Sequence, residues 1–318
     1  MNFREQIDYS AVSTYATCRR KFMFQYIFHL KSTFPSIDLV FGSAWHYGLE
    51  IAYKTAQNER SISATDLTKI SIDAFTKYWS VTGANHFHNE DAIYPKSPGN
   101  AMNMYYEYWQ RYHIELKEKK IVGVEIPFKI ILPDTTTAYI GRMDLAFTCA
   151  GMFQIIDHKT AKYANDIIYA GFYSSLQTDG YLAAGKMYFE SLPTMTYNIA
   201  ICQKAKIDFP RYDVIKRDSA TERFLVELKE LIKDIHKNLD IYETEKSQNN
   251  STSFIVKAFQ RNPGMACTQY FRKCPYFDLC MTINNIYKFQ DVCPSGFIKE
   301  EWNPEEHEAK ITQLLNEV

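Results

Sequence analysis

The sequence predicts a mixed α/β (or α+β) fold with a helical elaboration at its N-terminal side. Residues 1–120 carry apolar side chains mainly at helical spacing. From residue 121 the pattern changes to short apolar and β-branched runs that are separated by turn residues. The elements then follow in the order β-β-β-α-β-β, before a long helix and a cysteine-rich tail. We therefore expect one sheet-containing core.

The N-terminal part is expected to hold four helical stretches. The first begins at a capping serine and places aromatic residues at helical spacing. The second, "FGSAWHYGLEIAYKTAQ", opens with Gly42 and Ser43. The expected helices span residues 10–30, 41–57, about 64–80 and 98–119.

Three strands are expected to follow in sequence. They are "IVGVEIPFKIIL" (121–132), "TAYIGRMDLAF" (137–147) and "MFQIIDHKT" (152–160), with turns at "PDTT" and "CAG" between them. A helix is expected over about 165–190, then the strands "MTYNIAICQK" and "FPRYDVIK", and a helix over about 218–246. The segment after residue 246 contains three closely spaced cysteines and ends in a charged helix.

The composition is that of an ordinary globular protein and excludes few classes of function. The chain has 318 residues, 46% hydrophobic and 23% charged, and a net charge of −1, so any nucleic-acid contact must use local basic groups such as Arg142. No apolar run approaches the ~18–20 residues of a membrane span, and charges occupy the N-terminus where a signal peptide is apolar. We therefore expect a cytoplasmic protein with no membrane partner, whose seven cysteines are buried thiols or metal ligands.

Two charged positions interrupt runs that otherwise indicate buried strands. Asp157 and Lys159 lie two apart and therefore project from the same face, and the preceding hairpin can bring Asp144 beside them. Two carboxylates suit Mg²⁺ or Mn²⁺, and a lysine can orient water and stabilise charge at a phosphodiester. A lone Asp-x-Lys is more often a buried ion pair, so the surrounding residues decide between the two interpretations.

Other residues could complete such a site. His46 lies on the 41–57 helix, where a single histidine is usually a packed core residue. Gln177 and Tyr181 are four apart and share one helix face after the third strand, although such a pair could equally lie on the surface.

These motifs occur in a recognisable order: "GSAWH", "GRMD", "IIDHKT" and "QTDGY", over residues 42 to 181. In this order the sequence resembles the PD-(D/E)XK nuclease superfamily, specifically its RecB-like branch. The resemblance implies a restriction-endonuclease-like αβββαβ core. It also implies a single nuclease domain over 1–318, divided into a helical part (1–120), a nuclease core (121–246) and a cysteine-rich segment (247–318).

The resemblance assigns a role to each motif residue. It makes Asp144, Asp157 and Lys159 catalytic, and Gln177 and Tyr181 residues that support the site or contact DNA. It implies a Mg²⁺ or Mn²⁺ ion held by His46, Asp144, Asp157 and the backbone carbonyl of His158. Bulky aromatic or aliphatic residues are common at the His158 position, but only its backbone is needed. Glu125 matches an acidic position on the first strand of this branch, and Glu125 and Arg142 are possible accessory residues.

The cysteines form a second constellation. Cys267, Cys274 and Cys280 have the spacing C-x6-C-x5-C, which favours a metal site, and either Cys18 or Cys293 could supply a fourth ligand. Spacing alone leaves a local zinc site with Cys293 open. The resemblance to AddB-type and CRISPR-associated RecB-like exonucleases instead implies a structural [4Fe–4S] cluster on Cys18, Cys267, Cys274 and Cys280. The cysteine-rich segment would then pack on the N-terminal helix.

The expected function is a metal-dependent DNA exonuclease that acts on single-stranded DNA or on DNA ends. Its process would be recombination, DNA repair, phage replication or CRISPR spacer processing. The alternatives are a structure-specific endonuclease on branched or flap DNA, and a zinc-stapled, non-catalytic DNA-binding subunit. The sequence has no G-x-x-x-x-G-K-[ST] motif, so ATP-driven unwinding would require a helicase or another recombination or CRISPR partner.

Overall fold

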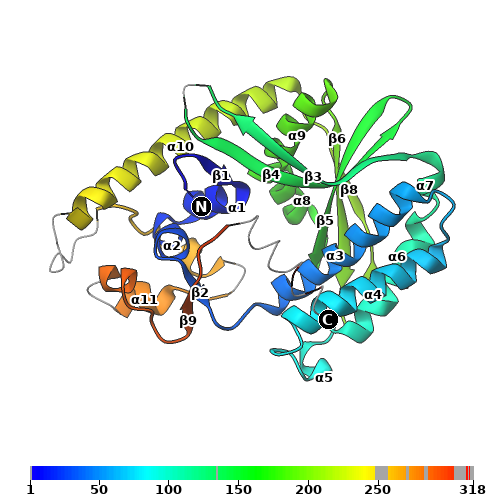
Figure 1. The fold of residues 1–318 in the computed structure, drawn as a ribbon, viewed down its shortest axis with the longest axis horizontal. Helices are drawn as coiled ribbons and strands as arrows, with labels where there is room; N and C mark the ends of the chain where they lie inside the picture. Colours follow the sequence, from blue (N-terminus) through cyan, green and yellow to red (C-terminus); the bar gives the residue numbers. More distant parts are fainter. Residues whose placement is uncertain are drawn as a thin grey trace. The chain divides into compact units, whose positions relative to one another are not determined.

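The computed structural model describes residues 2–133, 135–247, 257–269, 272–282 and 286–303, together with 313 and 315. Its contacts divide the chain into two compact units (Figure 1). The first unit comprises Met1–Phe34, Lys129–Ile140 and Arg223–Glu308, and the second comprises Pro35–Phe128, Gly141–Glu222 and Ala309–Val318. The single nuclease domain expected over 1–318 remains a prediction.

The second unit contains most of the sheet. Its strands are β3 (Lys120–Ile131), β4 (Ala138–Cys149), β5 (Met152–Ala161), β6 (Thr194–Cys202), β7 (Ile207–Asp208) and β8 (Arg211–Val214), the first two of which continue from or into the first unit. The order is β4-β5-β6-β7, with β3 paired to β4 and β8 to β6. A tight turn joins the antiparallel strands β4 and β5. Strand β6, buried from Met195 to Cys202, pairs parallel with β5, as expected of a central strand.

A crossover connects β5 to β6, because parallel neighbours cannot be joined by a hairpin. It consists of α8 (Asp166–Tyr173) and α9 (Leu176–Phe189). We expected one helix over about 165–190, but it is divided in two. Ser175 begins α9 as its N-cap, and its hydroxyl accepts a hydrogen bond from Gln177 N at 3.1 Å.

A group of helices precedes these strands in the second unit. It consists of α3 (Ile37–Asn58), α4 (Ala64–Thr82), α5 (Glu90–Ile93), α6 (Pro98–Tyr112) and α7 (Glu115–Glu118). Ser63 and Ser97 cap α4 and α6, and Pro98 occupies the first turn of α6. Aromatic packing joins α3 to α6, since the Trp45 and Tyr105 rings stack at 4.2 Å. In Figure 1, α3, α4 and α6 lie together, and α9 lies apart from them across the strands.

The first unit begins with β1 (Gln6–Asp8), which pairs parallel with the first residues of β4. It continues with α1 (Tyr9–Thr17), α2 (Arg19–Phe22), a π-helix (Met23–Ile27) and β2 (Leu30–Ser32), which pairs with β9 (Phe297–Lys299). Most of α10 (Asp218–Ser247), two 3-10 turns (Met265–Cys267 and Ile286–Gln290) and α11 (Phe277–Thr282) also belong to it. The cysteine-rich segment packs on the N-terminal residues, because Tyr276 stacks on Phe24 and donates to Leu30 O.

The mixed α/β fold class is confirmed, with all three expected strands of the hairpin region present. The helix expected over 10–30 is interrupted, because Cys18 adopts an extended conformation (φ −160°, ψ 110°) between α1 and α2. The helix expected over 98–119 is also interrupted, since α6 ends at Tyr112. The charged C-terminal helix falls mainly on 304–318, almost all of it outside the described residues.

Among the residues that the structure describes, no helix has both the length and the apolar character needed to cross a bilayer.

Candidate active site

The centre of the candidate site is the place where β4 and β5 stop pairing. Their last paired residues are Leu145 and Ile156, so Asp144 and Asp157 come directly after the end of the ladder. There the Asp144 carboxylate replaces a backbone acceptor, because its Oδ2 accepts the His158 N–H at 2.9 Å. One aspartate from each strand is thereby held at the same end of the hairpin.

Asp157 is fully buried and contacts two of the predicted residues. Its Oδ1 accepts a hydrogen bond from Gln177 Nε2 at 3.2 Å, and its Oδ2 lies 2.7 Å from Lys159 Nζ. The lysine contact is an ion pair without hydrogen-bond geometry, because Oδ2 accepts no aligned bond from the described residues. Gln177 Nε2 also donates to the Tyr181 hydroxyl at 3.1 Å. Residues of β5 and α9 therefore form one connected group.

His46 reaches the same group from α3. Its Nδ1 lies 3.3 Å from Asp144 Oδ2, and its side chain remains 31% exposed. Gly42, one turn earlier, allows α3 to approach β5 closely, since a Cβ atom there would lie 3.3 Å from Thr160 Oγ1. The glycine of "GSAWH" thus brings the histidine of the same motif to the strand that carries Asp157.

Glu125 lies on β3 in a left-handed backbone conformation, with φ 54°. Buried positions are Ile121 before it and Phe128 after it, so the inward and outward alternation shifts by one residue, as at a β-bulge. Its carboxylate forms an ion pair with Arg142 Nε of β4. Non-glycine residues in this conformation are uncommon and concentrate at functional sites.

The pKa values of the acidic side chains at the site are raised, mainly by burial. Burial raises the pKa of Asp157 to about 6, although the Lys159 ammonium opposes the shift. Burial likewise raises the pKa values of Asp144 and Glu125, and repulsion from Asp144 adds to the shift at Glu125. The pKa of His46 is lowered, first by burial and then by Lys159, so this imidazole is neutral near pH 7.

Sequence analysis missed one further acidic residue, Glu50. It lies four residues after His46 on α3, and its side chain is 17% exposed and paired with Lys54 at 2.6 Å. Its charge contributes to the raised pKa values of Asp144 and Glu125, which places it near both. The sequence did indicate this position, because Glu50 lies four residues after His46 and residues four apart on a helix share a face.

The His158 side chain points away from the carboxylates and into the core. Asn198 Nδ2 lies 3.1 Å from its Nδ1, and the same amide donates to the Tyr108 hydroxyl at 2.7 Å. The Tyr53 ring stacks on the imidazole, with centroids 5.8 Å apart. This buried network orients the ring, while the backbone N–H of His158 faces Asp144. Sequence analysis missed Tyr53, Tyr108 and Asn198, because only the fold shows which strand and helix positions meet.

The side chains of the site differ in their arrangement and in their chemistry as potential metal ligands. As placed, no three His, Cys, Asp or Glu side chains within the described ranges could share one ion. The carboxylate ligands nevertheless suit a hard divalent cation. The charge of Asp144 adds to the raised pKa of Asp157. The Oδ2 of Asp157 accepts no aligned hydrogen bond from the described residues. In the present arrangement the Lys159 ammonium contacts this oxygen.

The cysteines of interest all belong to the first unit. Burial raises the pKa values of Cys274 and Cys280, and electrostatic interactions with Cys18 and Cys267 raise both further. The backbone N–H of Cys274 donates to Cys267 O at 2.8 Å. The extended residue at the α1–α2 junction is Cys18 itself, so the interruption of that helix coincides with a predicted ligand. Cys293 interacts differently, since its thiol contacts Phe297 O at 3.2 Å.

The structure therefore brings together the predicted residues His46, Asp144, Asp157, Lys159, Gln177 and Tyr181, with Glu125 and Arg142 beside them. Comparison with known proteins adds one match: the family model of the PD-(D/E)XK nuclease superfamily matches residues 6–281. A search of curated proteins found no match.

Proposed function

Because the chain belongs to the PD-(D/E)XK nuclease superfamily, we propose that it is a metal-dependent deoxyribonuclease of the RecB-like branch, active on single-stranded DNA or on DNA ends. Membership of the superfamily implies a nuclease, a hydrolase of phosphodiester bonds. The observation that carries the proposal is the meeting of Asp144, Asp157 and Lys159 where β4 and β5 separate.

The site residues have two proposed roles, which are metal binding and stabilisation of negative charge. Asp144, Asp157, His46 and the His158 carbonyl would hold Mg²⁺ or Mn²⁺, which supplies a polarised phosphate and a more acidic water. Lys159, released from its ion pair with Asp157, donates to the attacking water or to a phosphate oxygen and stabilises the negative charge that develops there. Water adds to phosphorus, the P–O bond to the sugar oxygen breaks, and a proton passes to that leaving oxygen.

Two residues position this group. Gln177 donates to Asp157 and to Tyr181 at once, so it fixes the carboxylate relative to α9. The His158 backbone N–H fixes Asp144 in the same way from β5. These bonds leave the second oxygen of Asp157 facing Lys159, the residue that would act on the phosphate.

We further propose that Cys18, Cys267, Cys274 and Cys280 bind a structural [4Fe–4S] cluster. Support comes from the electrostatic interactions that join these four thiols and from the basic residues near them, since Arg20 interacts with Cys18 and Cys280. A cluster with four thiolates carries negative charge, which nearby guanidinium groups offset. A zinc site with Cys293 would instead require its thiol to leave Phe297 O.

An anaerobic preparation tests both proposals. Its visible spectrum and its activity on labelled single- and double-stranded DNA with Mn²⁺ would be compared for the wild type, Asp144→Ala and the exposed control Asp91→Ala. We expect a broad band near ~400 nm, cleavage by the wild type and the control, and none by Asp144→Ala. Cleavage that persists in Asp144→Ala would overturn the active-site proposal, and a colourless sample would overturn the iron–sulfur proposal.

A further inference from the structure

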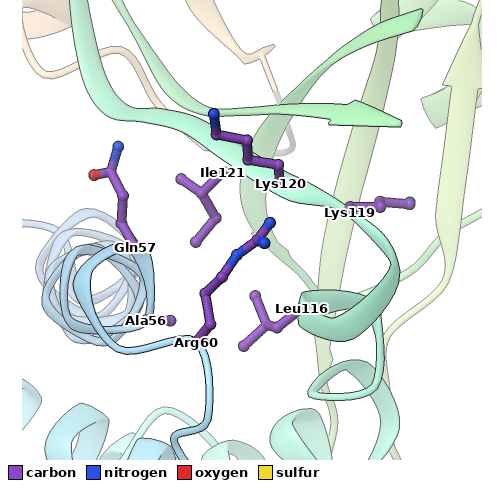
Figure 2. Close-up of a pocket in the computed structure, with 7 residues that line it drawn as sticks. All are labelled: Ala56, Gln57, Arg60, Leu116, Lys119, Lys120 and Ile121. Atoms are coloured by element: carbon purple, nitrogen blue, oxygen red, sulfur yellow. The ribbon is translucent and has the colours of Figure 1, made fainter. Parts of the chain in front are cut away.

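An open hollow lies between the end of α3 and the beginning of β3 in the second unit (Figure 2). It measures about 300 Å³, counting the solvent at its mouth. Its floor is apolar and consists of Ala56, Leu116 and Ile121. Its rim is polar and is formed by the side chains of Gln57, Arg60 and Lys120, together with the backbone around Lys119.

The rim carries positive charge that no carboxylate of the described residues pairs with. Arg60 and Lys120 are both exposed, and no carboxylate within the described ranges pairs with either. Lys119 differs, because its ammonium lies 3.4 Å from Glu115 Oε2 and 3.0 Å from Gln154 Oε1, and Figure 2 shows it directed away from the hollow. Two cationic side chains above an apolar floor can bind an anion that is attached to an apolar group.

The hollow is aligned with the acidic cluster along two elements. On α3, Glu50 and Gln57 follow His46 by four and eleven residues, which keeps the three on one helix face, and Arg60 comes two residues after the helix ends at Asn58. At 1.5 Å per residue, Gln57 lies about 16–17 Å from His46 along the helix axis. On β3, Lys120 lies five residues before Glu125, or roughly 17 Å along the strand. The distance along α3 and the distance along β3 therefore give about the same separation between the acidic cluster and the hollow.

A third cation lies between the two sites. Lys54, on the same helix, pairs with Glu50, and its charge also acts on Glu125 by lowering its pKa. Its side chain is 47% exposed. Lys54, paired with Glu50, therefore lies between the carboxylates and the two cations of the rim, where a nucleic-acid strand joining the two sites would pass.

From this geometry we propose that the hollow binds a backbone phosphate of the DNA strand being cut, with the deoxyribose against the apolar floor. The proposal rests on the deoxyribonuclease function proposed above. At one phosphate per ~3.4 Å of axis in a strand stacked as in B-form DNA, the site lies about five nucleotides from the scissile bond. No lining residue is aromatic, so the hollow suits the sugar-phosphate backbone rather than a stacked base.

The test compares strand lengths in the variant Arg60→Gln/Lys120→Gln. Dissociation constants of labelled single strands would be measured by fluorescence anisotropy with EDTA present, so that no strand is cut. The matched control is Lys69→Gln/Lys77→Gln, which removes two exposed charges from α4. We expect the double variant to bind strands of about 16 nucleotides roughly tenfold more weakly, with a salt-dependence slope smaller by about 0.7. Strands of about 4 nucleotides and the control variant should show wild-type affinities.

Two results would overturn the phosphate site. One is unchanged affinity for long strands in the double variant. The other is an equal loss for short and long strands, which is the result expected of a free anion site or of general charge attraction. Cleavage assays with Mn²⁺ test the proposed function separately. A wild type that cuts no DNA would overturn that function, while the length-dependent affinities would still decide on the hollow.

Discussion

The backbone N–H of His158 donates to Oδ2 of Asp144 across 2.9 Å, directly after the last paired positions of β4 and β5. A side chain here takes over the acceptor role that a strand would otherwise provide. Asp144 therefore has a structural partner as well as a proposed catalytic role. Substitutions at this position can separate the two, because some side chains keep the acceptor and lose only the charge.

Asp144→Asn is expected to remove activity without loss of stability. The amide oxygen can still accept the His158 N–H, while the removal of a buried negative charge relieves the repulsion that raises neighbouring pKa values. We expect the rate of DNA cleavage to fall by at least about 100-fold and the midpoint of thermal unfolding to stay level or rise. Labelled-DNA assays and calorimetry would measure the two quantities.

The exposed substitution Asp91→Asn is the control for the loss of one negative charge. An Asp144→Asn protein that cuts DNA at the wild-type rate would return Asp144 and Asp157 to the interpretation of a structural ion-pair network. A clearly lower unfolding midpoint would show that the charge itself stabilises the fold.

Gln177→Leu is expected to affect stability and activity together. The substitution leaves Oδ1 of the fully buried Asp157 without the amide that now donates to it. Such an unsatisfied group costs about 1–3 kcal/mol, and we expect the free energy of unfolding to fall by that amount. Cleavage should fall about tenfold, because a carboxylate held less firmly is a weaker part of a preorganised site.

The control for this prediction is Tyr181→Phe, which removes the other acceptor of the same amide and leaves the Asp157 bond in place. Urea unfolding of both variants would measure the difference. Equal losses in the two variants would mean that the α9 packing, and not the bond to Asp157, accounts for the effect.

The closeness of His46, Asp144, Asp157, Lys159 and Gln177 could be predicted from the sequence, although their roles stay predictions. Strand alternation and the short hairpin place the three β-strand residues, and helical spacing orients the other two. The order of the motifs supplied the remaining information, because it resembled a family with a known arrangement.

Other features could not be predicted because they depend on tertiary contacts. The bulge at Glu125 depends on how β3 packs, and the interruption at Cys18 lies inside a segment whose local pattern is helical. The buried bond between His158 and Asn198 joins residues 40 apart in sequence, on parallel strands whose register the sequence does not reveal. Glu50 alone had a local signal that was overlooked.

The cysteine variants Cys274→Ser and Cys293→Ser distinguish the two possible metal sites. If Cys18, Cys267, Cys274 and Cys280 hold an iron–sulfur cluster, Cys274→Ser should lose most of the absorbance near ~400 nm. It should also unfold at a lower temperature, since the cluster joins segments far apart in the chain. Cys293→Ser should match the wild type in both measurements. Bound zinc that is lost from both variants, with no absorbance near ~400 nm in the wild type, would support the local zinc site instead.

The pH dependence of stability should include a contribution from Asp208 that is unrelated to the acidic cluster. The Arg111 guanidinium, 2.8 Å away, together with Lys206 lowers the pKa of this carboxyl to about 2, against about 3.9 in an unfolded chain. A carboxyl with a lowered pKa in the folded state stabilises the protein above its unfolded pKa, and this stabilisation disappears as the pH falls toward the folded value.

Asp208→Asn should therefore lower the free energy of unfolding by no more than about 1 kcal/mol at pH 7, because solvent screens the pair. The difference should be the same at about pH 5 and smaller at about pH 3, as measured by urea unfolding. A difference that grows on acidification would contradict the assignment of the stabilisation to the ionised Asp208.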